Sequence, residues 1–149
     1  MHKIVIDSRN QSLRLFQDAE LLFEAPVSTS RFGLGFETGS GKTPTGNFRV
    51  HRKIGGDMPM GTVFKGRKPV ADPVDWSTKE NLITSRILWL DGLDEQNAQS
   101  KDRYIYIHGT NHEDLIGQPA SGGCIQMRNA DVVRLFDKVD EGTLVEIIG

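Results

Sequence analysis

Residues 104–129 read Y-I-Y-I-H-G-T-N-H-E-D-L-I-G-Q-P-A-S-G-G-C-I-Q-M-R-N, and this stretch carries most of the information on fold and chemistry. It opens on alternating aromatic and β-branched residues, Tyr104 to Ile107, which predict a strand that ends on His108. It closes on Gly122-Gly123-Cys124, which holds the only thiol of the chain. The stretch therefore predicts a strand that delivers an imidazole and a glycine-framed loop that delivers a thiol.

These two groups can act together as a nucleophile and its base. A free thiol is mostly protonated at neutral pH, and only the thiolate attacks a carbonyl well. His108 can supply the base, since the segment between it and Cys124 is long enough for a loop that doubles back to a neighbouring strand. Glycines before the cysteine let the backbone approach a substrate and direct amide groups at an oxyanion.

The same residues also allow a purely structural interpretation. A lone cysteine is most often a small buried hydrophobic residue, and a histidine at a strand end is most often a surface or capping residue. Local cysteine signatures do not transfer between families. The residue pattern alone leaves both interpretations open.

Outward from this stretch, the rest of the chain reads as short strands. After the cysteine, Asn129 is the expected N-cap of a helix that runs through Lys138, and a short second helix is expected over Ser77 to Leu82. The long excursion at 57–75 should lie on the surface. We expect a single mainly β domain, residues 1–149, with strands at Lys3–Asp7, Ser12–Phe16, Leu21–Val27, Phe48–Ile54, Thr62–Phe64, Thr84–Leu90 and Thr143–Ile148.

Composition agrees with one enzyme domain. The chain has 149 residues, 26% of them charged, and a net charge of −2, so no strong field favours nucleic acid or an anionic membrane. One cysteine cannot form an internal disulfide, and no apolar run approaches the roughly 20 residues of a membrane span. The start, M-H-K-I-V-I-D, reads as a strand and lacks the apolar core of a signal peptide. We expect a cytoplasmic protein, or a periplasmic one if a natural leader precedes this sequence.

Two other kinds of site are not favoured. Gly41-Lys42-Thr43 invites a phosphate-loop interpretation, but the glycine spacing fails, and Pro44 follows where the phosphate-binding helix should begin. His108, His112 and His51 have no cysteine or carboxylate cluster at metal-ligand spacing. We therefore expect neither a cofactor nor a metal.

The decisive stretch resembles the signature of the L,D-transpeptidase catalytic domain family (YkuD-like). That signature is a histidine followed by glycine or serine, a variable loop, and then Ser-His-Gly-Cys, often continued as Ile-Arg-Met and an asparagine. The block from Gly41 to Phe48 resembles the Thr-Pro-x-Gly-x-Phe segment of the family, so the likeness spans essentially the whole chain. The matching residues of the signature are His108, Gly109, Ser121, Gly123, Cys124, Ile125, Met127 and Asn129.

Two positions depart from the family pattern. Gly122 stands where the family usually has histidine, and Gln126 stands where it usually has arginine. The first change removes a polar side chain beside the nucleophile. The second removes a positive charge that could have held a substrate carboxylate or raised the thiolate fraction. Either change could alter the acceptor or lower activity.

The resemblance implies a sandwich of two mixed sheets with one clear α-helix after the cysteine, and a site at one edge. In that site His108 takes the thiol proton, Cys124 attacks a carbonyl, and the carbonyl of Gly109 orients the imidazole. Comparable insertions in the family border the substrate groove, so Arg67, Lys68 and Trp76 are candidate wall residues, although a solvated charge pair is the favoured interpretation of Arg67 and Lys68. Trp89 is expected in the core. The oxyanion and substrate-binding positions are expected at Gly123, Gly122, Ser121, Arg128 and Tyr106.

The implied substrates are peptidoglycan tetrapeptide stems. We expect an L,D-carboxypeptidase that trims released tetrapeptides to tripeptides and frees D-alanine during cell-wall recycling. The alternatives are a periplasmic L,D-transpeptidase that forms cross-links and a degenerate domain that binds wall peptides without turnover. The expected partners are muropeptides, with no nucleic acid and no membrane span, and the expected state is a monomer.

Overall fold

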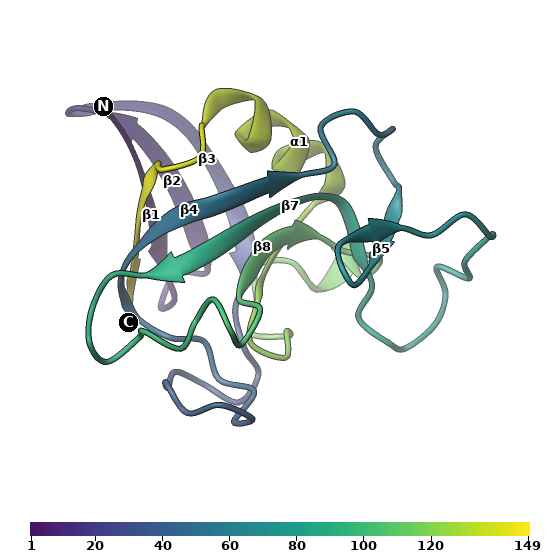
Figure 1. Ribbon diagram of the computed structural model, residues 1–149, viewed down its shortest axis with the longest axis horizontal. Coiled ribbons are helices and arrows are strands. Elements are labelled where there is room, and N and C mark those ends of the chain that lie inside the picture. Colours follow the sequence, from purple (N-terminus) through teal and green to yellow (C-terminus); the bar gives the residue numbers. More distant parts are fainter.

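The computed structural model describes residues 1–149 and is built mostly of strands (Figure 1). The expected strands are present, with at least one end of each shifted by one or two residues. Two helical segments complete the chain, the short 3-10 helix η1 (Glu113–Leu115) and α1 (Asn129–Lys138). The strands are β1 (His2–Asp7), β2 (Ser12–Gln17), β3 (Glu20–Ser28), β4 (Gly46–Ile54), β5 (Val63–Lys65), β6 (Lys68–Pro69), β7 (Ile83–Gly92), β8 (Tyr106–Gly109), β9 (Ile125–Met127) and β10 (Leu144–Ile148).

Eight of the strands close into a barrel. The order around it is β4-β10-β1-β2-β3-β9-β8-β7, and β7 pairs back onto β4, while β5 and β6 extend outward from β7. The pairs β1/β10 and β8/β9 are parallel, and the other pairs are antiparallel. The mainly β class with one α-helix is confirmed, but the two-sheet sandwich is wrong. β4 pairs with β10 on one side and with β7 on the other, so the sheet has no break at which it could divide in two.

The barrel encloses one apolar core. Alternation along β1 places Ile4 and Ile6 inside, where both are fully buried. α1 packs against β7 and β8, and three of its side chains, Val132, Leu135 and Phe136, join the same core. The helix therefore fixes the segment that follows the cysteine onto the barrel.

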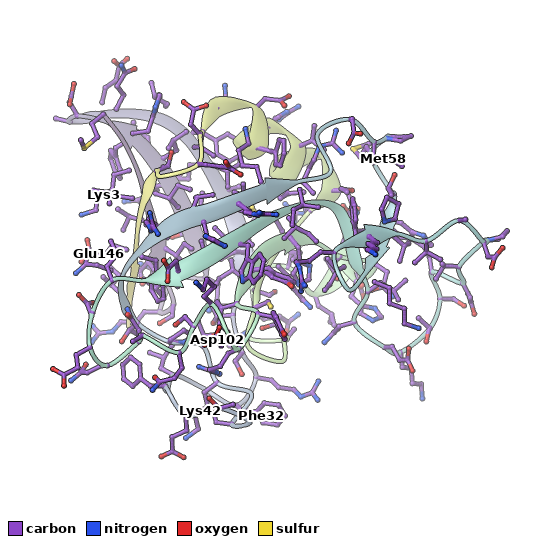
Figure 2. The ribbon with its side chains drawn as sticks, viewed as in Figure 1. Lys3, Phe32, Lys42, Met58, Asp102 and Glu146 are labelled. Carbon is purple, nitrogen blue, oxygen red and sulfur yellow. The ribbon has the colours of Figure 1, made fainter.

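Polar side chains cover much of the outside. Lys3 Nζ on β1 lies 2.9 Å from Glu146 Oε1 on the neighbouring β10 (Figure 2). Both side chains are more than a third exposed, so this pair stabilises the fold by at most about 1 kcal/mol. No helix has the length and apolarity that crossing a bilayer requires.

The start of α1 differs from the expectation. Arg128 is the N-cap, without a side-chain hydrogen bond, and Asn129 is the first helical residue. The side-chain amide of Asn129 instead contacts β7, where its Oδ1 accepts hydrogen bonds from the hydroxyls of Thr84 (2.6 Å) and Ser85 (2.5 Å). Its Nδ2 donates to the carbonyl of Thr110 at 2.9 Å. Asn129 therefore ties α1 to β7 and to the end of β8.

Two further local expectations were wrong. The strand of the decisive stretch begins at Tyr106, because Tyr104 has a left-handed φ of 57°, which lies outside the range of regular strand backbone. Residues 77–82 form turns and bends, and no helix. There Asp75 Oδ1 accepts hydrogen bonds from both the amide and the hydroxyl of Ser77, and such local side-chain bonds compete with helix formation.

Candidate active site

Cys124 directly precedes β9, and it lies on the same face of the sheet as His108 on the adjacent strand β8. β8 and β9 are parallel with Ile107 opposite Ile125, and both isoleucines point into the core. Alternation therefore places Cys124, next to Ile125, on the outer face with His108. In ideal strand geometry, residues one strand and two positions apart have Cα atoms about 8 Å apart, a span that a cysteine and a histidine side chain can close.

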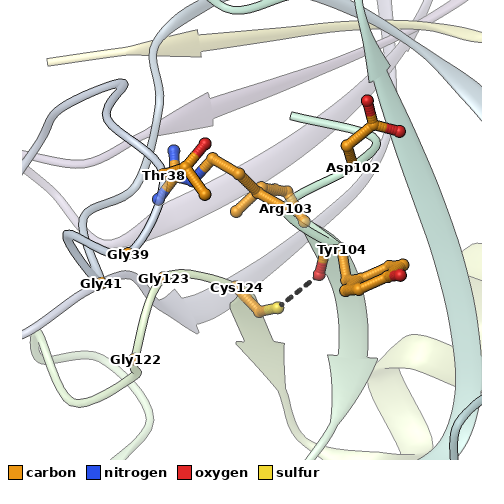
Figure 3. Close-up of a pocket in the computed structure, with 10 residues that line it drawn as sticks. Thr38, Gly39, Gly41, Asp102, Arg103, Tyr104, Gly122, Gly123 and Cys124 are labelled. Atoms are coloured by element: carbon orange, nitrogen blue, oxygen red, sulfur yellow. Dashed lines mark hydrogen bonds between the residues drawn. The ribbon is translucent and has the colours of Figure 1, made fainter. Parts of the chain in front are cut away.

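The thiol is held by the main chain of the segment that leads to His108. The amide of Tyr106 donates to Cys124 Sγ at 3.4 Å, and the thiol donates to the carbonyl of Tyr104 at 3.3 Å (Figure 3). Burial raises the pKa of the thiol to about 11, although the Tyr106 amide and the Arg103 charge oppose that rise. Cys124 is free and partly exposed, and at neutral pH it is a thiol.

The imidazole is buried and oriented by its own strand. His108 is 3% exposed, and its Nδ1 faces the carbonyl oxygen of Gly109. This contact assigns the proton to Nδ1, so Nε2 is free to accept a proton. Burial lowers the pKa of His108 to about 4, with the Gly109 carbonyl opposing the shift. At rest the thiol and the imidazole are therefore both neutral.

Gly109 has no room for a side chain. A Cβ at this position would lie 2.6 Å from Asn129 Oδ1 and 2.6 Å from the carbonyl oxygen of Thr84. The residue that orients His108 is thus enclosed by β7 and by the first residue of α1. This enclosure fixes the carbonyl that the imidazole contacts.

Ser121 anchors the loop that carries the thiol. Its hydroxyl donates to the carbonyl of Cys124 at 2.5 Å and accepts from the amide of Gly123 at 3.2 Å. Gly123 has a φ of +133°, which favours glycine, and its carbonyl accepts from the Thr43 hydroxyl at 2.9 Å. The amide of Ser30 in turn donates to that same hydroxyl at 3.0 Å. Hydrogen bonds of Ser121 and Thr43 therefore hold the loop in place without substrate.

These bonds change the expected set of oxyanion donors. The Gly123 amide is occupied by Ser121, whereas the amides of Gly122 and Cys124 donate to no acceptor within the protein. The Thr43 contact was missed from the sequence, where the block from Gly41 to Phe48 was matched to the family segment but given no contact with the cysteine loop.

A pocket of about 430 Å³ opens beside the thiol. Gly122, Gly123 and Cys124 line it, whereas the expected substrate-binding residues Ser121, Arg128 and Tyr106 do not. Ser121 is buried in the loop anchor, and Arg128 is exposed at the start of α1. Tyr106 reaches the site through its amide. Arg103, which also lines the pocket, was missed although it lies three residues before the strand that carries His108.

Arg67 is more than a solvated charge. Its guanidinium lies 4.6 Å from the ring centroid of Trp89 and 5.1 Å from that of Tyr104, and its Nη1 donates to the Tyr106 hydroxyl at 3.1 Å. The solvated-pair expectation was therefore wrong for Arg67. Trp89 is half-buried in this outer cluster and is not part of the main core. The excursion that carries β5 and β6 is tied here to the segment that holds the thiol.

Gln126 lies next to His108. It is the register partner of His108 on β9, is 2% exposed, and its Oε1 has no hydrogen-bond partner.

The other histidines raised as metal candidates have different contacts. His51 packs edge-on against Trp89 with ring centroids 5.0 Å apart, and His112 Nε2 faces the carbonyl of Glu80 at 3.0 Å.

Comparison with known proteins gives one consistent family. Residues 1–147 match the family model of the L,D-transpeptidase catalytic domain, YkuD. The putative L,D-transpeptidase YqjB of Bacillus subtilis is 48% identical over 145 residues, which are 97% of this chain and 69% of that protein. The resemblance noted from the sequence is thus confirmed over nearly the whole chain.

Solved structures agree on the fold at low sequence identity. An L,D-transpeptidase from Mycobacterium smegmatis superposes with a TM-score of 0.62 at 17% identity, over 99% of this chain and 58% of that one. L,D-transpeptidase 3 from Mycobacterium tuberculosis, in complex with a faropenem-derived adduct, gives a TM-score of 0.65 at 17% identity, with 99% and 60% coverage. The chain therefore spans about three fifths of the length of these structures.

Proposed function

Because the chain belongs to the L,D-transpeptidase catalytic domain family, we propose that it is a cysteine acyl-transfer enzyme that trims peptidoglycan tetrapeptides to tripeptides. The observation that carries this proposal is the site on β8 and β9. There a partly exposed thiol shares a face with a buried imidazole whose Nδ1 is engaged by the Gly109 carbonyl. This arrangement suits general-base activation of a thiol.

In the first step His108 Nε2 takes the proton of the Cys124 thiol as Sγ attacks the carbonyl of the third stem residue. The S–H bond must turn away from the Tyr104 carbonyl, which accepts it in the resting state. In this proposal the free amides of Gly122 and Cys124 hold the oxyanion. The C–N bond then breaks, and the amine of D-alanine leaves with the proton from Nε2, so that a thioester remains.

In the second step water attacks the thioester. Nε2 takes one proton from the water and passes it to the sulfur as the C–S bond breaks, and the tripeptide leaves with a new carboxyl group that loses the second proton to solvent. We propose that hydrolysis occurs in the cytoplasm, where stem peptides return during cell-wall recycling. One chain supplies every residue of this site, and we propose that the enzyme acts as a monomer.

The competing activity replaces water by the amine of a second stem, and the product is then a cross-link. To separate the two, purified protein is incubated with a free tetrapeptide or its disaccharide derivative, and the products are resolved by mass spectrometry. Tripeptide with an equimolar amount of D-alanine supports the proposal. Dimeric stems without tripeptide would identify a transpeptidase instead.

A third candidate is a domain that binds wall peptides without turnover. This candidate is considered because Gly122 and Gln126 stand where the family usually has histidine and arginine. The M. tuberculosis relative has been solved with a faropenem-derived adduct, which makes penem and carbapenem compounds suitable probes. A mass increase on Cys124 after exposure to such a compound supports the enzyme. An unmodified Cys124 would favour the binding domain.

A further inference from the structure

The pocket beside the thiol contains a single cationic side chain. Four glycines form much of its lining, and the guanidinium of Arg103 extends from the segment before β8 toward the loop that carries Thr38 (Figure 3). Because glycines have no side chains, they add no charged or polar side-chain groups to the pocket and leave space for a small residue. The lining residues that matter here are Gly39, Gly41, Gly122, Gly123, Arg103 and Cys124.

Arg103 is held in place yet keeps donors to spare. Its Nη2 donates to the carbonyl of Lys42 at 2.6 Å, and its Nη1 lies 3.5 Å from the carbonyl of Gly35. A guanidinium has five N–H donors, so about three are left for another acceptor. No carboxylate of the protein forms an ion pair with Arg103.

The neighbouring acid does not neutralise this charge. Asp102 also lines the pocket, but its carboxylate points away from the Arg103 guanidinium (Figure 3). The positive charge of Arg103 acts electrostatically on Cys124, since it lowers the pKa of the Cys124 thiol, whereas burial raises that pKa. A fixed, unneutralised guanidinium within electrostatic reach of an acyl-transfer sulfur is suited to bind an anion.

We propose that Arg103 binds the C-terminal carboxylate of the residue that leaves when the scissile bond is cut. This inference rests on the proposed function, and it specifies the substrate class as peptides with a free carboxylate one residue beyond the attacked carbonyl. The attacked carbonyl lies at Cys124, and the leaving residue extends into the glycine-lined pocket, where a side chain as small as a methyl group fits. A planar carboxylate matches the paired donors of a guanidinium.

Arg103 and the oxyanion donors bind different charges of the substrate. The amides of Gly122 and Cys124 receive the charge that develops during the reaction, whereas Arg103 receives a charge already present in the substrate. Amidation of the substrate C-terminus removes the negative charge of its carboxylate and leaves the scissile bond unchanged. It should therefore weaken binding even when no chemistry can occur.

The test measures binding in a Cys124→Ala background, which cannot form the thioester. Isothermal titration compares a tetrapeptide that ends in a free D-alanine carboxylate with the same peptide ending in a carboxamide. The free acid is expected to bind at least about tenfold more tightly, as a charge-assisted hydrogen bond implies. Adding Arg103→Gln should bring the ratio of the two affinities to near one, and Arg103→Lys should retain part of the preference because it keeps the charge.

Arg134→Gln is the matched control, since Arg134 is an exposed arginine on α1 away from the pocket, and it should leave the ratio unchanged. Thermal melts show whether Arg103→Gln disturbs the loop to which Arg103 is tied, and Arg103→Lys serves if the glutamine variant does not fold. Equal affinity for acid and amide, no binding of either peptide, or a ratio unaffected by Arg103→Gln would each overturn the inference. Binding that follows the prediction in a protein that releases no D-alanine would overturn hydrolysis alone.

Discussion

The amide of Tyr106 donates to the sulfur of Cys124 at 3.4 Å, so the strand that carries His108 also positions the thiol. Two residues further along β8 lies His108, on the same face. The thiol and the imidazole are therefore oriented by one stretch of backbone, and neither depends on a charged side chain to hold it.

Burial of a neutral His108 predicts a pH-dependent stability. Its pKa is lowered from 6.5 to about 4, so the unfolded chain takes up a proton at a pH where the folded protein does not. The stabilisation is complete above pH 6.5 and is lost as the pH falls toward 4. Urea unfolding at pH 7 and pH 4 should show a decrease that is about 3 kcal/mol larger in wild type than in His108→Gln. The same decrease in both proteins would contradict a buried neutral imidazole.

The raised pKa of Cys124 predicts slow alkylation near neutrality. Because only the thiolate reacts, the rate with iodoacetamide should rise about tenfold per pH unit between pH 7 and pH 10 and level off near pH 11. Loss of absorbance of a coloured thiol reagent, followed by stopped flow, gives the same profile. A plateau that begins at pH 7 would mean that the resting sulfur is already a thiolate paired with a protonated imidazole.

Gly109→Ala should destabilise the fold through the environment of the base. The added methyl would meet a backbone oxygen and the Asn129 side chain at 2.6 Å, and such overpacking costs about 2–3 kcal/mol. Gly122→Ala is the matched control, since no atom lies within 4 Å of a Cβ there. Denaturant unfolding should separate the two variants clearly. A Gly109→Ala protein as stable as wild type would show that β7 and α1 can yield.

Ser121→Ala tests the anchor of the cysteine loop. The change removes the bonds to the Cys124 carbonyl and the Gly123 amide and should cost about 1–3 kcal/mol of stability. Ser77→Ala removes an exposed serine hydroxyl bond and should change stability by less than about 0.5 kcal/mol. If thermal melts give the two variants the same stability, the hydroxyl of Ser121 does not hold the loop.

The strands and the helix could be predicted from the sequence because alternation and helical periodicity are local. Closure of the barrel could not be predicted, because the alternation of residues in β4 does not indicate that this strand pairs with both β10 and β7. The thiol and the imidazole could be paired through the family resemblance. Arg103 could not be placed, because its contacts with Lys42 and Gly35 join segments about sixty residues apart.

The Gly123 amide shows a different reason for failure. A glycine-rich loop predicts amides available to an oxyanion, but the bonds of Ser121 decide which of them remain free. Arg67 is a similar case. Its left-handed φ of 66° and its stacking on Trp89 depend on the path of the whole excursion, and not on the neighbouring Lys68.

The most direct test of the central claim is the rate at which an activated acyl donor modifies the protein, followed by intact-mass spectrometry with a carbapenem. Wild type should gain one adduct on Cys124, Cys124→Ala should gain none, and His108→Gln should react at least about 100-fold more slowly, as loss of a general base implies. A wild-type protein that stays unmodified, or a His108→Gln variant that reacts as fast as wild type, would contradict the account.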